Sequence, residues 1–438
     1  MSERPNILFI ISDQMTTALT GVYGHPVVQT PHLQRLAAES VRFDAAYTPF
    51  PLCSPSRACM MTGRHASEIG AWDNGALLPA DQVTFAHYLS NAGYDTVLSG
   101  KMHFVGPDQL HGFQRRLTTD IYSCHFDWVK PEWIRIKETQ GRDCEQVMGN
   151  RSTYNAQGYT GDSVRVGVWH NALSYDEEVH FRSVEYLRSA AHKSDDVPFM
   201  LCASYHHPHE PFLPPQEYWD LYEGTEIEIP EFPADLDKTY SLLDRNLNVY
   251  HGTRRCNLRD ADGLRRLRRA YYGLVTYMDD KVGELLDVLQ ETGLADNTLV
   301  VFASDHGDML CEKEMENGTE DLYIFAQAHE AVGVPCIMVR QGHFKYNYIH
   351  GNEDQLFDLE TDPGEWNNLL EDARHGEIAA ALRGKILQRF DPERMADENL
   401  ESLYRRWYIR DVMKANGTHW NHSPHFDARK GALDQYLA

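Results

Sequence analysis

The chain has 438 residues, of which 42% are hydrophobic and 24% charged, so it is long enough for a sizeable core and for two lobes or domains. Its formal net charge of −24 argues against binding to nucleic acid or to an anionic membrane surface, because both need clustered lysine and arginine. No apolar run reaches the roughly 18 residues of a membrane-spanning helix, the first run is too short for a signal peptide, and the eight cysteines have no regular spacing, which together favour a cytoplasmic location.

Four short apolar runs alternate along the chain with helical segments. They are rich in β-branched residues, which is typical of parallel strands buried on both faces. Apolar residues recur every three or four positions over residues 263–294, which predicts a long helix, and the charges of its arginine-rich start near residues 254–269 are expected to face solvent. This alternation predicts an α/β sandwich around a mostly parallel sheet. The four runs are NILFIISD (6–13), YDTVLSG (94–100), FMLCASY (199–205) and TLVVFASD (298–305).

The pattern changes near residue 336. CIMVRQGHFKYNYIHG and QLFDLETDPGEWNNLL predict strands, a hairpin and a turn, and helices rich in arginine and glutamate follow. We therefore predict a main domain at residues 1–335 and a smaller C-terminal subdomain with a tail at 336–438.

Polar residues stand just beyond each of the four apolar runs, namely Asp13, Lys101, His209 and Asp305. In parallel sheets ligands gather at the carboxyl ends of the strands, so these side chains are candidates for a common site. A single aspartate at a strand end is more often a helix cap or turn residue than a ligand. Their neighbours in the sequence must therefore decide between the two interpretations.

Cys53, Pro55 and Arg57 form a C-x-P-x-R pattern within PLCSPSRACMMTG, which is a weak signal by itself. Five further stretches follow in the order and context found in sulfatases of the alkaline phosphatase superfamily: NILFIISDQ, LSGKMHF, SYHHPHEPF, FASDHGD and QLFDLETDPGEWNNL. The chain resembles this family over most of its length. GKMHFVG, HGFQRRLTTDIY and the tail NGTHWNHSP are most similar to the choline sulfatase branch. The resemblance implies an alkaline-phosphatase-like fold and a sulfuric ester hydrolase.

In that family a separate formylglycine-generating enzyme oxidises the cysteine to formylglycine (3-oxoalanine), which here implies modification of Cys53. Hydrated formylglycine is a diol, in which one hydroxyl attacks sulfur and the other allows the sulfate to be expelled. A divalent metal and adjacent cations lower the pKa of this nucleophile. The metal ligands implied by the resemblance favour a hard ion such as Ca²⁺, with Mg²⁺ and Mn²⁺ left open. They are Asp13, Gln14, Cys53, Asp305 and His306.

The resemblance assigns roles to the remaining motif residues. Arg57 and Lys101 would neutralise the diol and the sulfate oxygens, and His103 would orient the diol. His209 would protonate the leaving oxygen, with His207 in the same motif as the alternative acid. Gln14 stands where many relatives have a second aspartate, a feature shared with the phosphonate monoester hydrolase and choline sulfatase branches.

The substrate's organic part is less well marked. A quaternary ammonium group is recognised by aromatic faces and a nearby carboxylate. Trp128, preceded by Asp127, lies where choline sulfatases place such an aromatic side chain, although an ordinary core or surface tryptophan is the alternative. In that branch the tail reaches a neighbouring subunit, which implies a homo-oligomer, but Asn421 stands where an acidic residue is expected. Asn74 in WDNG resembles a substrate-binding residue, with a turn asparagine as the alternative.

One departure from the family follows the Asp305–His306 pair. Relatives have a second sulfate-binding lysine about a dozen residues later, where this chain has Gly318, and Lys313 comes too early. Relatives also have a further strand and helices there, so the domain is expected to be shortened after about residue 312. Losing the lysine would slow the reaction on the order of 10²- to 10³-fold, and losing the strand would expose backbone groups and apolar faces.

Three functions follow from these observations. The first is hydrolysis of a small sulfate ester, either choline sulfate or a related alkyl or aryl sulfate. The second is hydrolysis of a phosphonate monoester or phosphodiester, because the same diol and metal accept phosphorus. The third is a shortened, catalytically impaired relative that acts as a binding protein.

Overall fold

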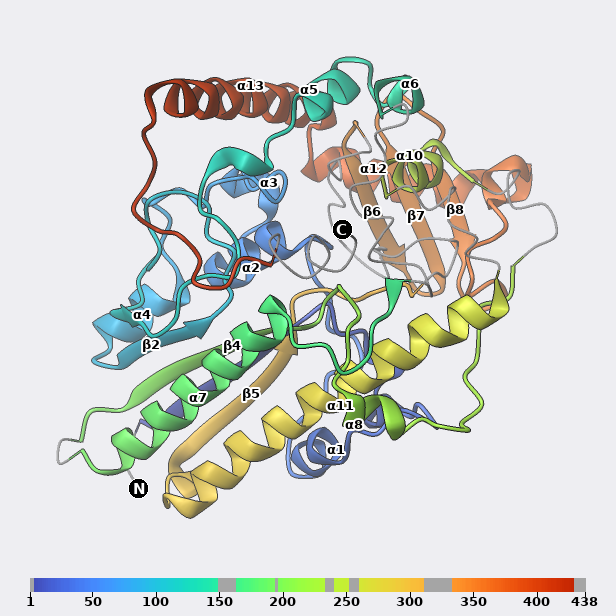
Figure 1. Cartoon of the computed structure of the whole chain (residues 1–438). Coiled ribbons are helices and arrows are strands. Elements are labelled where there is room, and N and C mark those ends of the chain that lie inside the picture. The colour runs from blue at the N-terminus through green and yellow to red at the C-terminus, as the bar shows by residue number, and fades with distance from the viewer. Residues whose placement is uncertain are drawn as a thin grey trace.

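The central sheet has five strands, and each neighbouring pair is parallel. A computed structural model describes residues 4–148, 163–193, 196–232, 240–251, 260–310 and 333–428. Within these residues the strand order is β3-β2-β4-β1-β5. Figure 1 labels β2, β4 and β5 of this sheet. The predicted α/β fold with a mostly parallel sheet is confirmed. The strands are β1 (Asn6–Asp13), β2 (Asp95–Gly100), β3 (Arg115–Arg116), β4 (Phe199–Pro208) and β5 (Thr298–Ser304).

Helices cover the sheet from both sides. α7 (Asn171–Ala191) and α11 (Ala261–Glu291) pack on one face, where Leu8 and Ile10 of β1 are fully buried. α2 (Cys53–Thr62) and α4 (Phe85–Asn91) pack on the other face, against β2 and β4. This burial stabilises the inner part of the sheet, which β1, β2 and β4 form.

The last strand, β5, does not fit the expectation of burial on both faces. Leu299 and Val301, which are 53% and 38% exposed, lie beside Ile7 and Phe9 of β1 on the side away from α11. No described residue pairs with the outer edge of β5. The prediction was wrong for this strand because burial of an apolar run depends on what lies beside it, which the run itself does not specify.

A smaller antiparallel sheet begins at residue 336, in the order β6-β7-β8. Its strands are β6 (Cys336–Gln341), β7 (Phe344–Ile349) and β8 (Gln355–Asp358). α12 (Gly376–Arg389) packs on this sheet, whereas α13 (Pro392–Asn416) returns to the main part of the chain and contacts α5 (Pro131–Glu138) (Figure 1). α13 thus packs on the main domain, while Met395 near its start packs with the residues of the small sheet.

The arginines at the start of α11 do not all face solvent. Arg268 is buried and forms an ion pair with Glu228 at 2.6 Å. The Arg269 guanidinium lies 4.1 Å from the centre of the Trp219 ring. The expectation of a solvated face was therefore wrong for these two side chains, because acidic and aromatic partners from residues 216–232 cover them. Residues 254–259 lie outside the described part of the chain.

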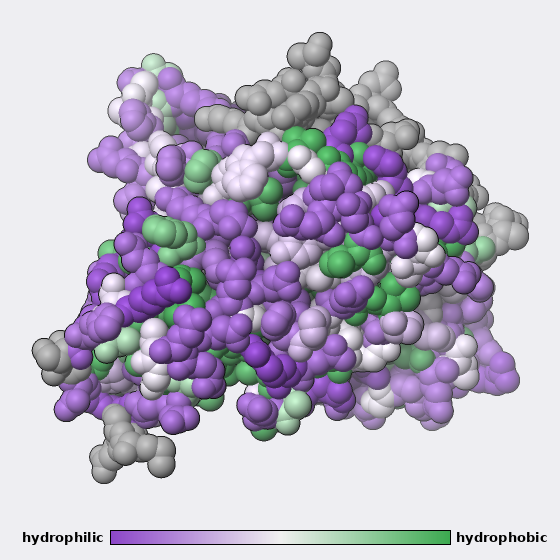
Figure 2. All heavy atoms as spheres, turned by 60° about the horizontal axis from the view of Figure 1, so that its bottom comes forward, coloured by the Kyte–Doolittle hydropathy of each residue, from purple (hydrophilic) through white to green (hydrophobic). Residues whose placement is uncertain are grey.

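Short helices connect the larger elements. Within the described part of the chain, no helix is both long and apolar enough to cross a bilayer. Hydrophilic side chains dominate the face seen in Figure 2, where the apolar areas are small and separate. The remaining elements are η1 (Thr17–Leu19), η2 (Gly21–Tyr23), α1 (Pro31–Ala38), α3 (Ala66–Ile69), η3 (Phe126–Trp128), α6 (Cys144–Met148), α8 (Gln216–Asp220), α10 (Leu242–His251), η7 (Ala295–Asn297), η9 (Leu369–Glu371) and η10 (Ala373–His375).

Candidate active site

The motif side chains meet at the carboxyl ends of β1, β2, β4 and β5, where ligands bind in parallel sheets. α2 points its first turn at the same place, and Arg57, four residues after Cys53, lies on the same face of that helix. The structure therefore gathers residues that are spread along the chain from Asp13 to His306. They are Asp13, Gln14, Cys53, Arg57, Lys101, His103, His209, Asp305 and His306.

The backbone at the ends of β1 and β2 has unusual conformations. Gln14 has a φ of 64°, its N–H donates to Asp305 at 3.0 Å, and its carbonyl accepts from the Tyr271 hydroxyl at 2.6 Å. These bonds hold a conformation that residues other than glycine rarely adopt. Gly100 has a φ of 112°, and a Cβ there would lie 1.8 Å from the carbonyl oxygen of Ser204. Only glycine allows the chain to deliver Lys101 so close to β4.

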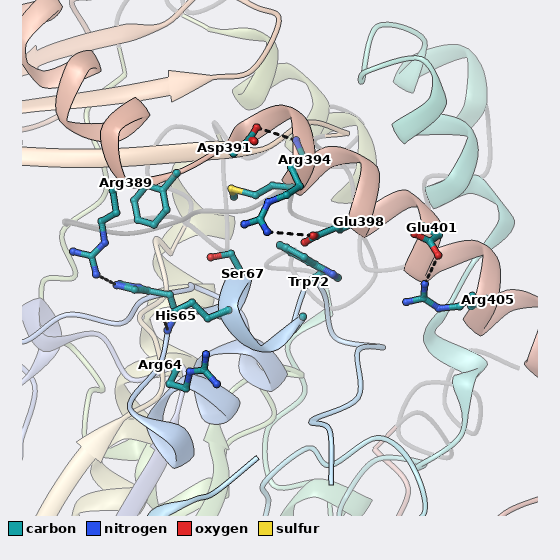
Figure 3. Close-up of a pocket in the computed structure, with 14 residues that line it drawn as sticks. Arg64, His65, Ser67, Trp72, Arg389, Asp391, Arg394, Glu398, Glu401 and Arg405 are labelled. Carbon is teal, nitrogen blue, oxygen red and sulfur yellow. Dashed lines mark hydrogen bonds and ion pairs between the residues drawn. The ribbon is translucent and has the colours of Figure 1, made fainter. Parts of the chain in front are cut away.

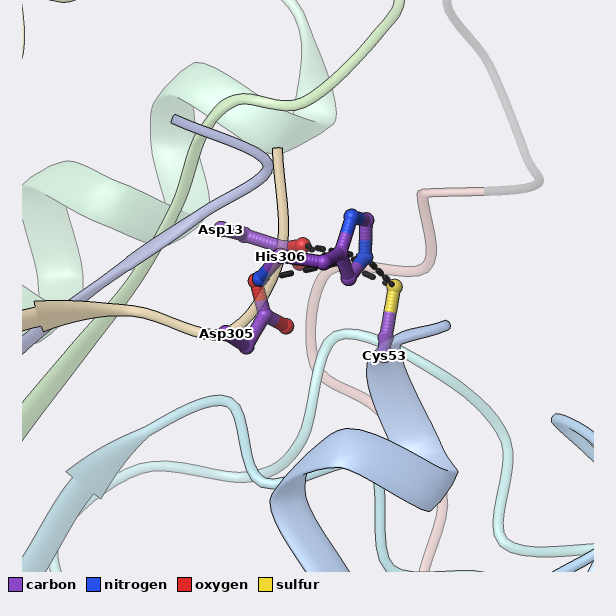
Figure 4. A group of neighbouring side chains, drawn as sticks. All are labelled: Asp13, Cys53, Asp305 and His306. Carbon is purple, nitrogen blue, oxygen red and sulfur yellow. Dashed lines mark hydrogen bonds and ion pairs between the residues drawn. The ribbon is translucent and has the colours of Figure 1, made fainter. Parts of the chain in front are cut away.

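Four side chains offer ligand atoms that lie within 4.8 Å of one another: Asp13, Cys53, Asp305 and His306 (Figure 4). The Cys53 sulfur is 3.3 Å from His306 Nε2 and 3.5 Å from Asp13 Oδ1. The Gln14 Oε1 atom is buried and has no hydrogen-bond partner among the described residues. Two carboxylates, an imidazole and an unpaired amide oxygen fit a divalent cation, for which oxygen ligands predominate.

Two buried cations contact the same carboxylates. Arg57 Nε lies 2.8 Å from Asp305 Oδ2 and Arg57 Nη2 lies 3.6 Å from Asp13 Oδ2, while Lys101 forms an ion pair with Asp13. Burial alone would raise the pKa of Asp13, but Lys101, His209, Arg57 and His306 together hold it well below its usual value. The carboxylate is therefore ionised at neutral pH, as a metal ligand must be.

The Cys53 thiol has the opposite tendency. Burial, followed by the nearby Asp13 carboxylate, raises its pKa. An unmodified thiol at this position therefore stays protonated at neutral pH and is a weak nucleophile.

The histidines near the thiol differ in charge. Burial opposes protonation of His209, but the Glu210 and Asp13 carboxylates raise its pKa well above the usual value, so it carries a proton to give. Burial and then Lys101 lower the pKa of His103, whose two ring nitrogens have no hydrogen-bond partner among the described residues. His207 is bound to Asp176, 2.6 Å from its Nδ1 atom. This geometry favours His209 over His207 as the acid.

This geometry has counterparts among known proteins. A family model for sulfatases matches residues 5–358. The chain belongs to the sulfatase family. It is similar to the choline-sulfatase of Rhizobium meliloti (strain 1021), with 33% identity over 500 aligned residues that cover 96% of this chain and 94% of that protein. An arylsulfatase of Clostridium perfringens (strain 13 / Type A) is 28% identical, and the match covers 89% of this chain and 79% of that protein. The prediction of a sulfuric ester hydrolase is confirmed.

Solved structures support the alkaline-phosphatase-like fold of this sulfatase. The phosphonate monoester hydrolase of Silicibacter pomeroyi has a TM-score of 0.67 and 20% identity, and the match covers 88% of this chain and 95% of that chain. The Agrobacterium radiobacter enzyme of the same name gives 0.65 and 19%, and covers 88% and 95%. The alignment to the choline-sulfatase, at 500 residues, is longer than this sulfatase, so that relative has segments without a counterpart here.

Aromatic rings line one side of the sulfatase site. The Tyr122 ring lies 4.7 Å from His103, 5.0 Å from Trp128 and 4.6 Å from the Lys101 Nζ atom, measured to ring centroids. Trp128 thus lies close to the predicted catalytic residue His103, as its own predicted role requires. Asn74 lies beside the start of α2, where its side-chain oxygen accepts the Ser54 N–H at 3.1 Å. This contact fits the alternative that Asn74 is a structural turn asparagine.

The described part of the tail packs on its own chain. Trp420 stacks on His125 with ring centres 5.6 Å apart, and the His425 N–H donates to Thr119 at 2.9 Å. Asn421 is exposed, and Asp127 forms an ion pair with Lys414 at 3.1 Å. The tail therefore covers the segment that carries Tyr122 and leads to Trp128.

Sequence reasoning missed several residues of the sulfatase site. Glu210, Asp308 and Tyr122 stand inside the stretches SYHHPHEPF, FASDHGD and HGFQRRLTTDIY, but received no role from sequence reasoning. Their position in those stretches was the signal that could have identified them. The predicted lysine position, Gly318, together with Lys313 and the shortened region after about residue 312, lies outside the described residues.

A separate cleft of about 560 Å³ lies between α3 and the C-terminal helices (Figure 3). Arg394 pairs with Glu398 at 3.6 Å and Arg405 with Glu401 at 2.6 Å, so its charges largely balance. None of the motif residues of the site lines it. Trp72 is among the residues that line the cleft, and it stands two positions before Asn74. The cleft is therefore next to the loop that carries Asn74.

Proposed function

We propose that this sulfatase hydrolyses a small sulfate ester, with choline sulfate as the first candidate, using a formylglycine made from Cys53 beside a divalent metal, preferably Ca²⁺. One observation carries the proposal. Cys53 begins a helix within ligand distance of Asp13, Asp305 and His306, and Arg57 and Lys101 are buried beside it. A sulfate group has three non-bridging oxygens, and such a pocket supplies the positive charge that they need.

The side chains of the site would have different roles in the reaction. When bound, the metal and the formylglycine would supply an activated oxygen nucleophile next to the sulfur. Asp13, Gln14, Asp305 and His306 would hold the ion. Arg57 and Lys101 balance negative charge that builds on the sulfate oxygens, and neutral His103 offers both ring nitrogens to polar hydrogens or oxygens there.

The protonated His209 is suited to protonate the leaving oxygen. This step matters most for alkyl sulfates, because an alkoxide is a poor leaving group. His209 is within 6.5 Å of the Tyr122 ring, so the leaving group would depart along the aromatic side of the site.

The same aromatic side supports choline sulfate as the first candidate. Tyr122 and Trp128 present aromatic faces, which attract a quaternary ammonium group by about 0.5 to 2 kcal/mol per contact. The similarity to a choline-sulfatase over nearly the whole chain supports the same substrate. The ion pair between Asp127 and Lys414 weakens the expected carboxylate, so the preference for a cation rests mainly on the rings.

The substrate is tested by comparing choline sulfate with an uncharged alkyl sulfate of equal length, in wild type and in Trp128→Ala. Wild type should prefer the cation, and Trp128→Ala should lower kcat/KM for choline sulfate by roughly 2- to 30-fold while sparing the uncharged ester. If wild type shows no preference, or both esters lose equally, the choline assignment fails and the sulfatase assignment stands.

The likeness to phosphonate monoester hydrolases favours one second candidate, a phosphonate monoester or phosphodiester hydrolase. Gln14 with His306 is the pairing that supports it. A phenyl phosphonate monoester assayed beside nitrophenyl sulfate separates the two functions by the ratio of kcat/KM values. Turnover of neither substrate by protein with a converted Cys53 would favour an impaired relative that only binds its ligand.

A further inference from the structure

A second layer of carboxylates lies behind the candidate metal ligands. The Gln14 Nε2 atom is 2.5 Å from Asp308 Oδ2 and 3.1 Å from Glu210 Oε2. Burial raises the pKa of Asp308 to about 7, and the Gln14 amide favours the ionised form because it donates to it. An amide NH₂ has two hydrogens and an ionised carboxylate only accepts, so both hydrogens of Gln14 are used. The opposite orientation of the amide would place its oxygen against two carboxylates. The two acids therefore allow one orientation, in which Oε1, the atom without a hydrogen-bond partner, is the one left for an ion.

Glu210 also contacts a second member of the site. Its Oε2 atom and its backbone carbonyl oxygen each lie 2.9 Å from His209 Nδ1. Two acceptors at Nδ1 hold a hydrogen on that nitrogen and fix the plane of the ring, which leaves Nε2 for the leaving group, and the carboxylate adds the negative charge that favours the protonated ring. One carboxylate oxygen thus touches both a candidate metal ligand and the candidate acid.

We propose that Asp308 and Glu210 are positioning residues, which together aim the Gln14 oxygen at the metal, and that Glu210 also aligns His209. The inference rests on the proposed function, since it assumes that Gln14 is a ligand. It explains why glutamine is suitable at position 14. A carboxylate there would face two others, whereas an amide donates at one end and presents an oxygen at the other.

Asp308→Asn is a direct test because the aspartate uses both oxygens. The Leu310 N–H donates to Oδ1 at 2.7 Å, and Gln14 donates to Oδ2. The single oxygen of an asparagine cannot serve both, so the amide of Gln14 loses one of its acceptors.

The experiment is calorimetric titration of Ca²⁺, Mg²⁺ and Mn²⁺ into the metal-stripped full chain with an unconverted Cys53, so that no turnover is needed. Asp308→Asn and Glu210→Gln should each weaken the affinity for the preferred ion by about 10- to 100-fold, as loss of such supporting residues does. Glu365→Gln is the matched control. The Glu365 and Glu210 side chains are both 16% exposed, and Glu365 forms its ion pair with Lys345, which is not a residue of the candidate site. It should bind metal like wild type.

A double variant separates positioning from general electrostatics. If Asp308 acts through Gln14, the affinity of Gln14→Ala/Asp308→Asn equals that of Gln14→Ala alone. Additive losses, or no loss in Asp308→Asn, overturn the inference. Gln14→Glu gives the same test if the Asp308 variant does not fold, and it should bind metal more weakly than wild type despite its added charge.

The role of Glu210 toward His209 has its own measurement. In converted protein, Glu210→Gln should lose more rate on an alkyl sulfate than on nitrophenyl sulfate, which scarcely needs an acid. Equal losses contradict that role. If wild type binds none of the three ions, the metal site itself is overturned. If wild type binds an ion and the Asp308→Asn and Glu210→Gln variants bind it equally well, only the inference is overturned.

Discussion

The inner strand β1 and the edge strand β5 of the central sheet are covered to different degrees, although both carry residues of the candidate site. On β1, Leu8 and Ile10 are fully buried beneath helices, whereas Leu299 and Val301 on β5 are open to solvent. Four of the five candidate metal ligands lie at the ends of these strands, Asp13 and Gln14 at β1 and Asp305 and His306 beyond β5, and the fifth, Cys53, begins α2. Packing therefore fixes the two ligands of β1 firmly.

The two candidate ligands that follow β5, Asp305 and His306, are held by fewer contacts. Asp305 is held by the pairing of β5 with β1, by Arg57, and by the Ser56 hydroxyl, which donates to its carbonyl at 2.6 Å. α2, which carries Cys53, thus also secures the β5 side of the site. The comparison indicates that polar contacts from α2 compensate where apolar cover is thin.

Cys53→Ala should have the largest effect, because it removes the proposed nucleophile, which α2 holds beside the candidate metal ligands of both strands. Turnover of a sulfate ester should fall on the order of 10⁴- to 10⁶-fold. Metal affinity should change little, since Asp13 and Asp305 supply most of the negative charge. The two readouts are steady-state kinetics and metal titration, and full activity in the variant would remove the proposed mechanism.

His209→Ala tests whether the end of β4 supplies the acid. An alkyl sulfate should lose about 10²- to 10⁴-fold in kcat, and nitrophenyl sulfate far less. The measurement is kcat on both esters for wild type and variant. Equal losses would reassign the acid, with His207 as the next candidate.

Asp73→Asn tests how α13 stabilises the loop that carries Asn74. Arg406 of α13 donates to both Asp73 oxygens at 2.6 and 2.7 Å, next to Asn74. Removing one member of a buried pair costs about 3 to 5 kcal/mol at pH 7. Burial alone would raise the pKa of Asp73, but Arg406 and Lys137 hold it below its ordinary 3.8.

The sign of the pH dependence follows from that lowered pKa. The stability that ionised Asp73 contributes is fully present above pH 3.8 and is lost as the pH falls through the lower folded-state pKa. Urea unfolding of wild type and Asp73→Asn should therefore show a constant difference near pH 7 that narrows below 3.8. A difference that widens on acidification would contradict the assignment.

Leu8→Ala and Leu299→Ala compare the helix-covered face of β1 with the open face of β5, and Leu299→Ala should have the smallest effect of all. Leu8→Ala should lower the free energy of unfolding by about 2 to 5 kcal/mol, and Leu299→Ala by less than about 1 kcal/mol, because its side chain is already hydrated. Equal losses in urea unfolding would show that the outer face of β5 is covered in solution.

Local patterns predicted much of this fold. All four apolar runs became strands and the long periodic segment became α11, because strand and helix formation follow spacing within one segment. The motif residues also meet as expected, since strand ends of a parallel sheet share one edge. Their individual roles stay predictions.

What the sequence did not predict depends on distant partners. The burial of Arg268 needs Glu228, and Asp73 meets Arg406 from 333 residues away. Glu210 and Asp308 are adjacent only because β4 and β5 both flank β1. Such pairs arise from topology, which a single sequence specifies only indirectly.

The most direct test of the central claim is the mass of the peptide that contains Cys53, after co-expression with a formylglycine-generating enzyme. We expect this peptide to lose one sulfur and two hydrogens and to gain one oxygen, and sulfate-ester turnover to rise in proportion to the converted fraction. A peptide that keeps its thiol in a preparation that still hydrolyses sulfate esters would contradict it.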